Sequence, residues 1–340
     1  MFVAWRELWF ARGRFGLLVG VVLLITVLVG LLSGLTAGLA GRNTSAVVGL
    51  GGDHVVFAGV DGGFGGTGLD EGVARAWAGT AGVERAERLV VSLGRAEAGG
   101  RSAGVAVFAV PSGSALRGVE PGQVVVSAGA ADELGLRDGQ RVTIGGVEST
   151  ARLSTSDEYF SHAPVVWIHL PASARFSVLV LSTSDCDIAK ADAAIGTSTE
   201  STSEAVDRIG SFAAENGSLV LMRGFLFAIS ALVVGAFFTV WTIQRSGDIA
   251  VLKALGASTA YLLRDALGQA AVLLLAGTAL GTGLAAAIGA ALGDAVPFVL
   301  DLATLVVPAA VLVGLGLVGA ALAIRRVTAV DPLTALGSAR

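Results

Sequence analysis

Residues 245–258 read RSGDIAVLKALGAS, a charged segment between two long apolar runs. At helical spacing its apolar and charged residues separate, with Ile249, Leu252 and Leu255 on one face and Asp248 and Lys253 elsewhere. Gly256 then ends or bends the helix. A short amphipathic helix of this kind either lies in a membrane interface or docks into a groove on a partner.

The apolar runs on both sides of this segment predict membrane spans. They cover residues 15–41, 224–244, 266–293 and 302–324. Each reaches the length of about 20 residues that crosses a bilayer as a helix, and the chain is only 15% charged with a mean hydropathy of +0.76. The first run is too long for the apolar core of a signal peptide, about 7–15 residues, so we expect an uncleaved anchor. The predicted fold is a polytopic α-helical membrane protein with four transmembrane helices and a large α+β extracytoplasmic domain between helices 1 and 2.

Basic residues near the ends of the runs predict the orientation, because cytoplasmic connections are enriched in Lys and Arg. Nine cations lie on the side that we assign to the cytoplasm: Arg6, Arg12, Arg14, Arg245, Lys253, Arg264, Arg325, Arg326 and Arg340. The turn at 294–301 has none. Residues 42–223 hold 14 Lys/Arg and 21 Asp/Glu, a net charge of −7, whereas the rest of the chain holds 9 and 6, a net of +3. Both termini are therefore expected in the cytoplasm, with basic residues near anionic lipids.

The organisation that follows has ten parts. They are an amphipathic elbow at 1–14, a span at 15–41, the extracytoplasmic α+β domain at 42–202, a stalk helix at 203–223, a span at 224–244, a cytoplasmic coupling helix and loop at 245–265, a span at 266–293, a short outer turn at 294–301, a span at 302–324 and a cytoplasmic tail at 325–340.

The outer segment shows β signals after a glycine-rich start at 49–68, which we expect to be flexible. Residues 88–110 read as two strands joined through Gly99 and Gly100. Further strands are expected at 122–127, 140–146, 163–170 and 176–181, and helices at 70–78, at 130–136 and from 203 to 222. The stretch GTSTESTSE before the last helix is interpreted as a linker or a helix cap.

The sequence lacks the motifs of enzyme chemistry. There is no P-loop, HExxH or CxxC motif, and the three histidines are expected to be solvated or packed. Cys186 lies between Asp185 and Asp187, without the basic neighbour that activates a thiol. The runs also contain no ionisable residue, which disfavours an ion or proton carrier. We therefore expect a chain that is not an enzyme, has no intrinsic cofactor or metal, and binds no nucleic acid.

Glycines recur at intervals of four in two of the runs. The first run has Gly16, Gly20, Gly30, Gly34 and Gly38, and the third has Gly277, Gly281, Gly289 and Gly293. This spacing places the glycines on one helix face and lets a second helix approach closely. The spacing leaves open whether that helix belongs to the same chain or to a second copy.

Three stretches resemble the MacB/FtsX-type permeases of ABC transporters. In QRSGDIAVLKALGAS the family pattern falls on Arg245, Asp248, Ile249, Lys253, Ala254, Leu255, Gly256 and Ala257. The tail RRVTAVDPLTALGSAR is similar to the family's basic end followed by Asp331-Pro332 and Ala335-Leu336, and AWRELWFARGRFGLLVG is similar to its elbow before the first span. In the outer domain the resemblance covers residues 124–146.

The resemblance implies a homodimeric permease that works with two copies of a separate cytoplasmic ATPase. It assigns ATPase coupling to Arg245, Asp248, Ile249, Leu252, Lys253, Leu255 and Gly256. ATP-driven closure would move the outer domains through the stalk, a process called mechanotransmission.

The cargo is predicted from a narrower resemblance, because compact four-span permeases of this size resemble the HrtB-type haem exporters. That would place a site for haem, or a similar amphipathic compound, in the outer leaflet between spans 1 and 2 of the dimer. Candidate contacts are Met222 and Tyr159 as ligands, Phe225 and Phe227 beside the macrocycle, and Glu215 and Arg223 near propionates or lipid head groups. An alternative is a non-transporting FtsX-like regulator of an extracytoplasmic partner such as a cell-wall hydrolase.

Overall fold

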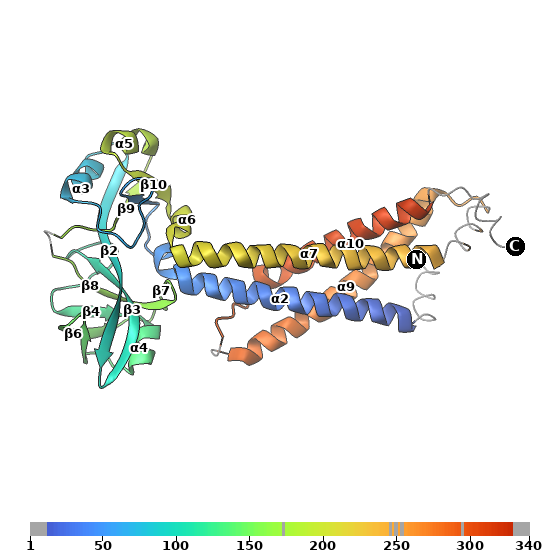
Figure 1. The fold of residues 1–340 in the computed structure, drawn as a ribbon, viewed down its shortest axis with the longest axis horizontal. Coiled ribbons are helices and arrows are strands. Elements are labelled where there is room, and N and C mark those ends of the chain that lie inside the picture. Colours follow the sequence, from blue (N-terminus) through green and yellow to red (C-terminus); the bar gives the residue numbers. More distant parts are fainter. Residues whose placement is uncertain are drawn as a thin grey trace. The chain divides into compact units, whose positions relative to one another are not determined.

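The computed structural model describes residues 12–171, 174–244, 247, 251, 255–293 and 296–328. The chain divides into two compact units, one of Leu39–Gly217 and one of Met1–Gly38 with Ser218–Arg340. Figure 1 shows that the first, which we call the sheet domain, holds the strands, and that the second, which we call the span unit, is helical. The boundary between the units falls inside two helices, α2 (Arg12–Val48) and α7 (Gly210–Gln244).

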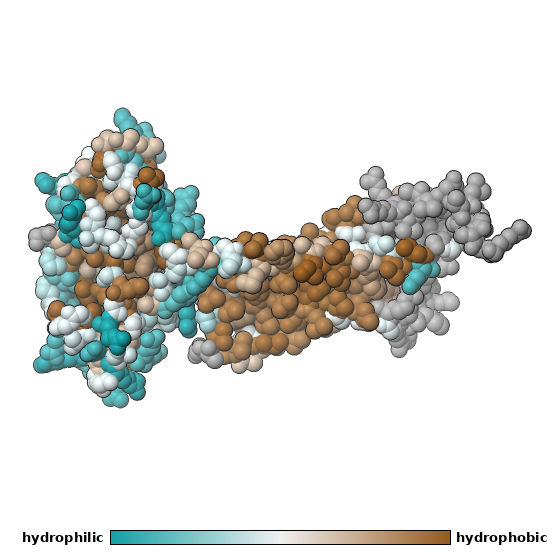
Figure 2. Space-filling view, viewed as in Figure 1, coloured by the Kyte–Doolittle hydropathy of each residue, from teal (hydrophilic) through white to brown (hydrophobic). Residues whose placement is uncertain are grey.

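The span unit contains helices long and apolar enough to cross a membrane. Among the described residues there are four: α2, α7, α9 (Thr259–Leu292) and α10 (Leu302–Thr328). Figure 2 shows hydrophobic residues over most of their visible surface. All four helices contribute to one buried cluster of Phe15, Leu18, Val22, Val234, Phe238, Trp241, Ala270, Leu273, Leu274 and Ala320. The chain is therefore a multi-pass membrane protein with one shared core in its span unit.

Five threonine hydroxyl groups inside these helices are bonded to the helix itself. Thr26, Thr36, Thr239, Thr242 and Thr278 each donate to the carbonyl four residues earlier, over 2.6–2.8 Å. This bond satisfies a polar group that lipid cannot solvate.

The sheet domain contains ten strands in the order β10-β1-β9-β2-β3-β8-β4-β6-β5, with β7 paired to β8. In chain order the strands are β1 (His54–Phe57), β2 (Val83–Ala98), β3 (Arg101–Val110), β4 (Gln123–Val126), β5 (Arg141–Ile144), β6 (Val147–Leu153), β7 (Tyr159–Phe160), β8 (Ala163–His169), β9 (Val178–Thr183) and β10 (Ser198–Ser201). Strand β5 also pairs with the far end of β2, so six of the strands close into a ring. The short helices are α3 (Glu71–Ala78), α4 (Ala128–Leu134), α5 (Ile188–Ile195), α6 (Thr202–Ala205) and the 3-10 turn η1 (Val206–Arg208).

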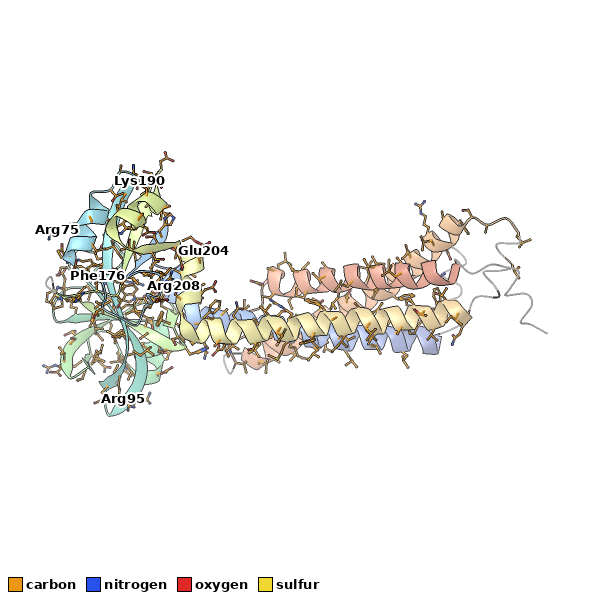
Figure 3. All side chains as sticks on the ribbon, turned by 45° about the horizontal axis from the view of Figure 1, so that its top comes forward. Arg75, Arg95, Phe176, Lys190, Glu204 and Arg208 are labelled. Atoms are coloured by element: carbon orange, nitrogen blue, oxygen red, sulfur yellow. The ribbon has the colours of Figure 1, made fainter. Side chains whose placement is uncertain are left out.

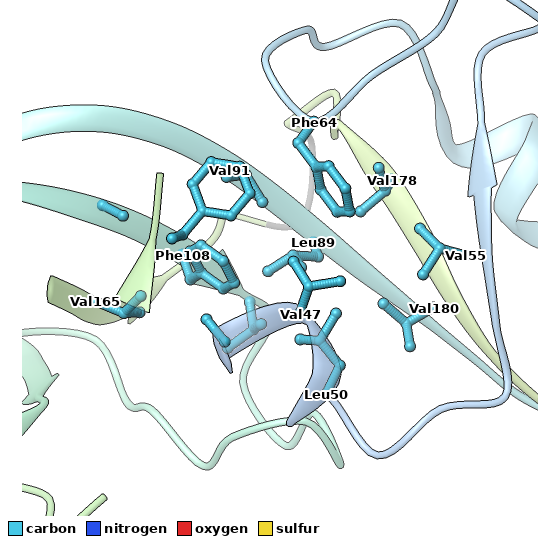
Figure 4. Close-up of a cluster of buried hydrophobic side chains, with 14 of the residues drawn as sticks. Val47, Leu50, Val55, Phe64, Leu89, Val91, Phe108, Val165, Val178 and Val180 are labelled. Atoms are coloured by element: carbon cyan, nitrogen blue, oxygen red, sulfur yellow. The ribbon is translucent and has the colours of Figure 1, made fainter. Parts of the chain in front are cut away.

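Aromatic rings fill the largest buried cluster of the sheet domain, part of which is shown in Figure 4. The Phe108 ring lies edge-on to Trp167 at 5.0 Å and to Phe160 at 5.6 Å between centroids. Arg208, labelled in Figure 3, lies at the domain's last turn. Its guanidinium lies 4.6 Å from the Phe57 ring centroid and donates to Glu200. These contacts fix the place where the chain leaves the sheet and enters α7.

Most predicted elements are confirmed. The strands expected at 88–110 form the β2–β3 hairpin, in which Ala98 pairs with Arg101 across Gly99 and Gly100. The strands expected at 122–127, 140–146, 163–170 and 176–181 correspond to β4, β5, β8 and β9, and the helices expected at 70–78 and 130–136 to α3 and α4. Asp70 caps α3, because its side chain accepts from the amides of Gly72 and Val73.

The helix predicted from 203 to 222 is wrong in its first part. The chain forms α6 and η1, becomes extended at Ile209, and only then begins α7 at Gly210, which continues to Gln244. Ala205 and Ile209 are both buried in the sheet-domain core. The extended backbone at Ile209 allows both side chains to pack into this core before α7 starts. The preceding GTSTESTSE stretch supplies both β10 and the Ser201 capping box of α6.

Two further boundaries differ from the prediction. Helix α2 does not end at residue 41 but continues to Val48, because Ala46 and Val47 pack into the sheet-domain core. The stretch at 49–68 is not flexible throughout, since it contains β1, which pairs with β9 on one side and β10 on the other. The elbow at residues 1–11, the coupling residues 245, 246, 248–250 and 252–254, and the tail at 329–340 lie outside the described residues.

Candidate functional site

The connection between α7 and α9 is the first candidate site. Arg245, Asp248, Ile249, Leu252 and Lys253 lie outside the described residues. Of the predicted coupling residues, the structure places two.

Leu255 and Gly256 form a tight turn just before α9. The Leu255 amide donates to the Val251 carbonyl over 3.0 Å, and the Leu255 side chain is 79% exposed. Gly256 has a φ of +92°, a backbone conformation that side chains disfavour. Ser258 then caps α9 by accepting from the Tyr261 amide over 3.2 Å. The turn thus presents a large apolar side chain, which is what a partner with an apolar groove would bind.

The glycines of the first span meet parts of the same chain. Gly30 lies against Ala285 of α9, where an added methyl group would come within 3.0 Å of the Ala285 Cβ. At Gly34 an added methyl group would collide with the Phe298 ring, and at Gly38 with the Pro297 carbonyl. Close packing within the span unit therefore accounts for this part of the glycine repeat.

Residues 297–299, which precede α10, pack into the space left by the missing side chains of Gly34 and Gly38. The Val299 amide donates to the Gly34 carbonyl over 3.1 Å, so the segment is bonded to α2 as well as packed on it. Phe298 also meets Gly289 of α9, where an added methyl group would collide with its ring. At the other end of α2, methyl groups at Gly16 and Gly20 would meet nothing within 4 Å in the described part of the chain.

The third-span glycines pack on α2. Added methyl groups would meet the Val22 side chain at 2.7 Å from Gly277 and the Thr26 side chain at 2.6 Å from Gly281. At Gly293, the last glycine of the repeat, the position is open and φ is +52°, which suits a helix end.

The predicted substrate residues fall into two groups. Met222 and Phe225 lie on α7 in the span unit with 47% and 60% of their surface exposed, whereas Phe227 and Arg223 are half-buried. The first residue of α7 that is buried is Ser230. The part of α7 before it thus presents apolar side chains that its own unit does not cover.

Tyr159 belongs to the sheet domain. The Arg42 guanidinium carbon lies 5.4 Å from the Tyr159 ring centroid. Burial and the neighbouring Asp157 carboxylate raise the pKa of Tyr159. The ring hydroxyl thus stays protonated at neutral pH when no metal is bound.

Glu215 takes part in a polar cluster that the sequence did not indicate. His162 Nε2 lies 2.8 Å from Glu215 Oε1 and 2.9 Å from Asn43 Nδ2. Asn43 Nδ2 also donates to Glu215 Oε2 over 3.1 Å, and Ser211 Oγ donates to Asn43 Oδ1 over 2.7 Å. Asn43 lies on α2, Ser211 and Glu215 on α7, and His162 in the turn between β7 and β8. The expectation that His162 is merely solvated or packed therefore missed this cluster.

Comparison with known proteins finds similarity in the second half of the chain. Residues 220–332 match the family model described as FtsX-like permease C-terminal. This match confirms the predicted resemblance over α7, α9, α10 and the connections between them.

Curated relatives match over a comparable length. The chain is 30% identical over 142 residues to the putative hemin transport system permease protein HrtB of Staphylococcus epidermidis, covering 42% of this chain and 41% of the relative. It is 36% identical over 131 residues to the protein of the same name from Staphylococcus haemolyticus, covering 38% and 37%. The matches thus span about two fifths of the length of these relatives.

Two solved structures show a distant likeness. The periplasmic region of MacB from Actinobacillus actinomycetemcomitans is 12% identical, with a TM-score of 0.34, and the match covers 46% of this chain and 92% of that one. The extracellular domain of the noncanonic ABC-type transporter YknZ from Gram-positive bacteria is 13% identical, with a TM-score of 0.34, and the match covers 44% and 98%.

Proposed function

We propose that this chain is the permease subunit of an ABC-type efflux transporter that works by mechanotransmission. A separate cytoplasmic ATPase, in two copies, would supply the energy to a homodimer of the chain. The observation that carries the proposal is the FtsX-like permease match over residues 220–332, which spans the predicted coupling segment and three of the four long helices. The division of α2 and α7 between the two units supports it, because each helix is long enough to carry movement from one unit to the other.

Haem, or a similar amphipathic compound of the membrane, is the proposed cargo. The support is the similarity to proteins named as hemin transport permeases and the exposed apolar stretch of α7 before Ser230. That stretch would take up lipid, a second copy of the chain or the cargo. Met222, Phe225, Phe227 and Arg223 remain the proposed contacts in the span unit, and Tyr159 and Glu215 the proposed contacts in the sheet domain.

The proposed orientation places both termini and residues 245–265 in the cytoplasm and the sheet domain outside the cell membrane. The charge distribution supports it, because the sheet domain and its flanks are acidic while the cations of the remaining chain gather at the connections assigned to the inside.

Coupling is tested by a charge at the exposed turn before α9. Leu255→Asp is expected to weaken binding of the ATPase by about tenfold or more, since a carboxylate in an apolar groove costs at least ~1.4 kcal/mol. Haemin-stimulated ATP hydrolysis by the complex, reconstituted in nanodiscs with a candidate ABC ATPase from the same cells, is the measurement. Leu302→Asp is the matched control, because Leu302 is equally exposed at 79% but lies at the start of α10.

The outcome separates the two candidate functions. Haemin-stimulated hydrolysis in the wild type, lost in Leu255→Asp and kept in Leu302→Asp, supports the transporter. Hydrolysis that ignores haemin, together with recovery of a cell-wall hydrolase on the purified complex, would instead establish the non-transporting regulator.

A further inference from the structure

Three hairpins of the sheet domain turn through two residues that both have positive φ. They are Gly99–Gly100 with φ of 55° and 80°, Gly145–Gly146 with 57° and 85°, and Ser161–His162 with 51° and 66°. Turns of this type favour glycine and asparagine, because a side chain crowds the left-handed backbone. The third turn therefore holds two residues in a disfavoured backbone conformation, and replacing them by glycine would relieve this strain.

The third turn differs from the other two in what it contacts. A methyl group at any of the four glycines would meet nothing within 4 Å among the described residues. The Ser161 amide, in contrast, donates to the Asn43 carbonyl over 3.1 Å, and the His162 amide donates to the Arg42 carbonyl over 2.9 Å. Both carbonyls belong to α2.

The side chains of the same turn contact the other long helix. Ser161 Oγ lies 2.9 Å from Ser211 Oγ, and His162 Nε2 lies 2.8 Å from Glu215 Oε1, both on α7. The turn is thus bonded to α2 through its backbone and through the His162–Asn43 contact, and to α7 through its side chains alone. A glycine pair would keep the backbone bonds to α2 and lose every side-chain bond to α7, together with the His162–Asn43 contact, which gives a physical reason for the strained residues.

We propose that Ser161 and His162 form a coupling joint, which transmits displacement of α7 relative to α2 into the sheet domain through β7 and β8. Asn43 completes the joint, because its side chain links α2 directly to Ser211 and Glu215. The inference deepens the proposed function and rests on it only for the statement that the transmitted movement serves transport. The joint itself is a property of the folded chain.

The test replaces Ser161 and His162 by two glycines, the pair that forms the chain's other two turns of this type. Spin labels at Lys190→Cys in the sheet domain and Leu232→Cys on α7, in a Cys186→Ala background, report the distance distribution between the domain and the helix. The labelled chain is diluted with unlabelled chain in nanodiscs, so that distances within one chain are measured. Ser161→Gly/His162→Gly is expected to broaden the distribution, because the side-chain bonds to α7 and the His162–Asn43 contact are lost while the backbone bonds to α2 remain.

Two further variants keep the test decisive. Ser211→Ala/Glu215→Ala removes the bonds between the turn and α7 from the helix side, together with the Asn43 bonds to Ser211 and Glu215, and must also broaden the distribution. The reciprocal control Gly145→Ser/Gly146→His places the strained pair in a free turn and must leave the distribution as in the wild type. Protection of the turn amides from hydrogen exchange verifies that the hairpin still forms in each variant.

An unchanged distribution in the glycine variant, or broadening in that variant but not in the helix variant, would overturn the joint. The distance measurement requires neither ATP nor haemin, so the joint and the proposed function fail separately. Broadening in a chain whose complex shows no haemin-stimulated hydrolysis would support the joint and count against the transporter.

Discussion

The chain's single cysteine shows how one residue's surroundings set its chemistry. Cys186 is half-buried between the end of β9 and the start of α5. Burial and the Asp187 carboxylate raise the pKa of its thiol, so less of it is thiolate at neutral pH than for a free cysteine. This agrees with the inert role that the sequence predicts for a thiol with acidic neighbours.

Slow alkylation of Cys186 is therefore expected. At pH 7 N-ethylmaleimide should modify Cys186 more slowly than an engineered cysteine at the exposed Lys190 in a Cys186→Ala background. The rate for Cys186 should rise with pH through a midpoint above that of the engineered thiol, because a raised pKa delays ionisation. Mass spectrometry of timed samples gives both rates. Equal rates at pH 7 would contradict the assigned surroundings.

Among the elements, α2 needs glycines of its own only near Gly30, Gly34 and Gly38. Gly38→Ala is expected to destabilise the span unit by about 1–3 kcal/mol, the usual cost of overpacking, because the added methyl group collides with the Pro297 carbonyl. Gly34→Ala should act in the same direction, with part of the collision relieved by rotation of the Phe298 ring. Thermal unfolding of the detergent-solubilised chain is the measurement.

Gly20→Ala is the matched control for these substitutions. Its added methyl group meets open space, and alanine favours a helix over glycine by up to about 1 kcal/mol in water-exposed helices. Gly20→Ala should therefore leave the melting temperature unchanged or raise it. If Gly38→Ala and Gly20→Ala melted alike, the packing of residues 297–299 against α2 would be wrong.

The elements that the sequence predicts well are those whose own residues decide their state. The spans follow from long uncharged runs, and the strands within residues 88–110 and β8 follow from short apolar stretches that contain several valines. Strand β10 reads Ser198–Ser201 and has no such pattern; its pairing with β1 decides its state. Its amides at Thr199 and Ser201 are covered by the side chains of Asp192 and Glu204, which protects an exposed edge.

The polar cluster of the coupling joint was out of reach of sequence reasoning for a different reason. Its partners are far apart in the chain, since Asn43 and His162 are separated by 119 positions and His162 and Glu215 by 53. The positive φ of Ser161 and His162 also leaves no trace in the residue types, which are neither glycine nor asparagine. The available signal was negative: a two-residue turn between strands that lacks the residues such turns prefer.

For the whole molecule, the decisive property is which side of the membrane holds the sheet domain and which side holds the 245–265 connection. The proposed transporter needs the 245–265 connection where an ATPase can reach it, and the sheet domain on the other side. In a Cys186→Ala background we expect a cysteine at Lys190 to react with a membrane-impermeant maleimide in intact cells. A cysteine at Lys253 should react only after the membrane is permeabilised.

The reason for this expectation is electrostatic. Moving the connection with Arg245, Lys253 and Arg264 outward would take three cations away from the anionic inner leaflet, at about 1 kcal/mol each. Moving the acidic residues 42–223 inward would place a net charge of −7 beside the same lipids. Labelling of Lys253→Cys in intact cells, with Lys190→Cys protected, would show the opposite orientation, and no cytoplasmic ATPase could then bind the exposed Leu255 turn. The sidedness of these two lysines therefore tests the coupling site and the cargo pathway together.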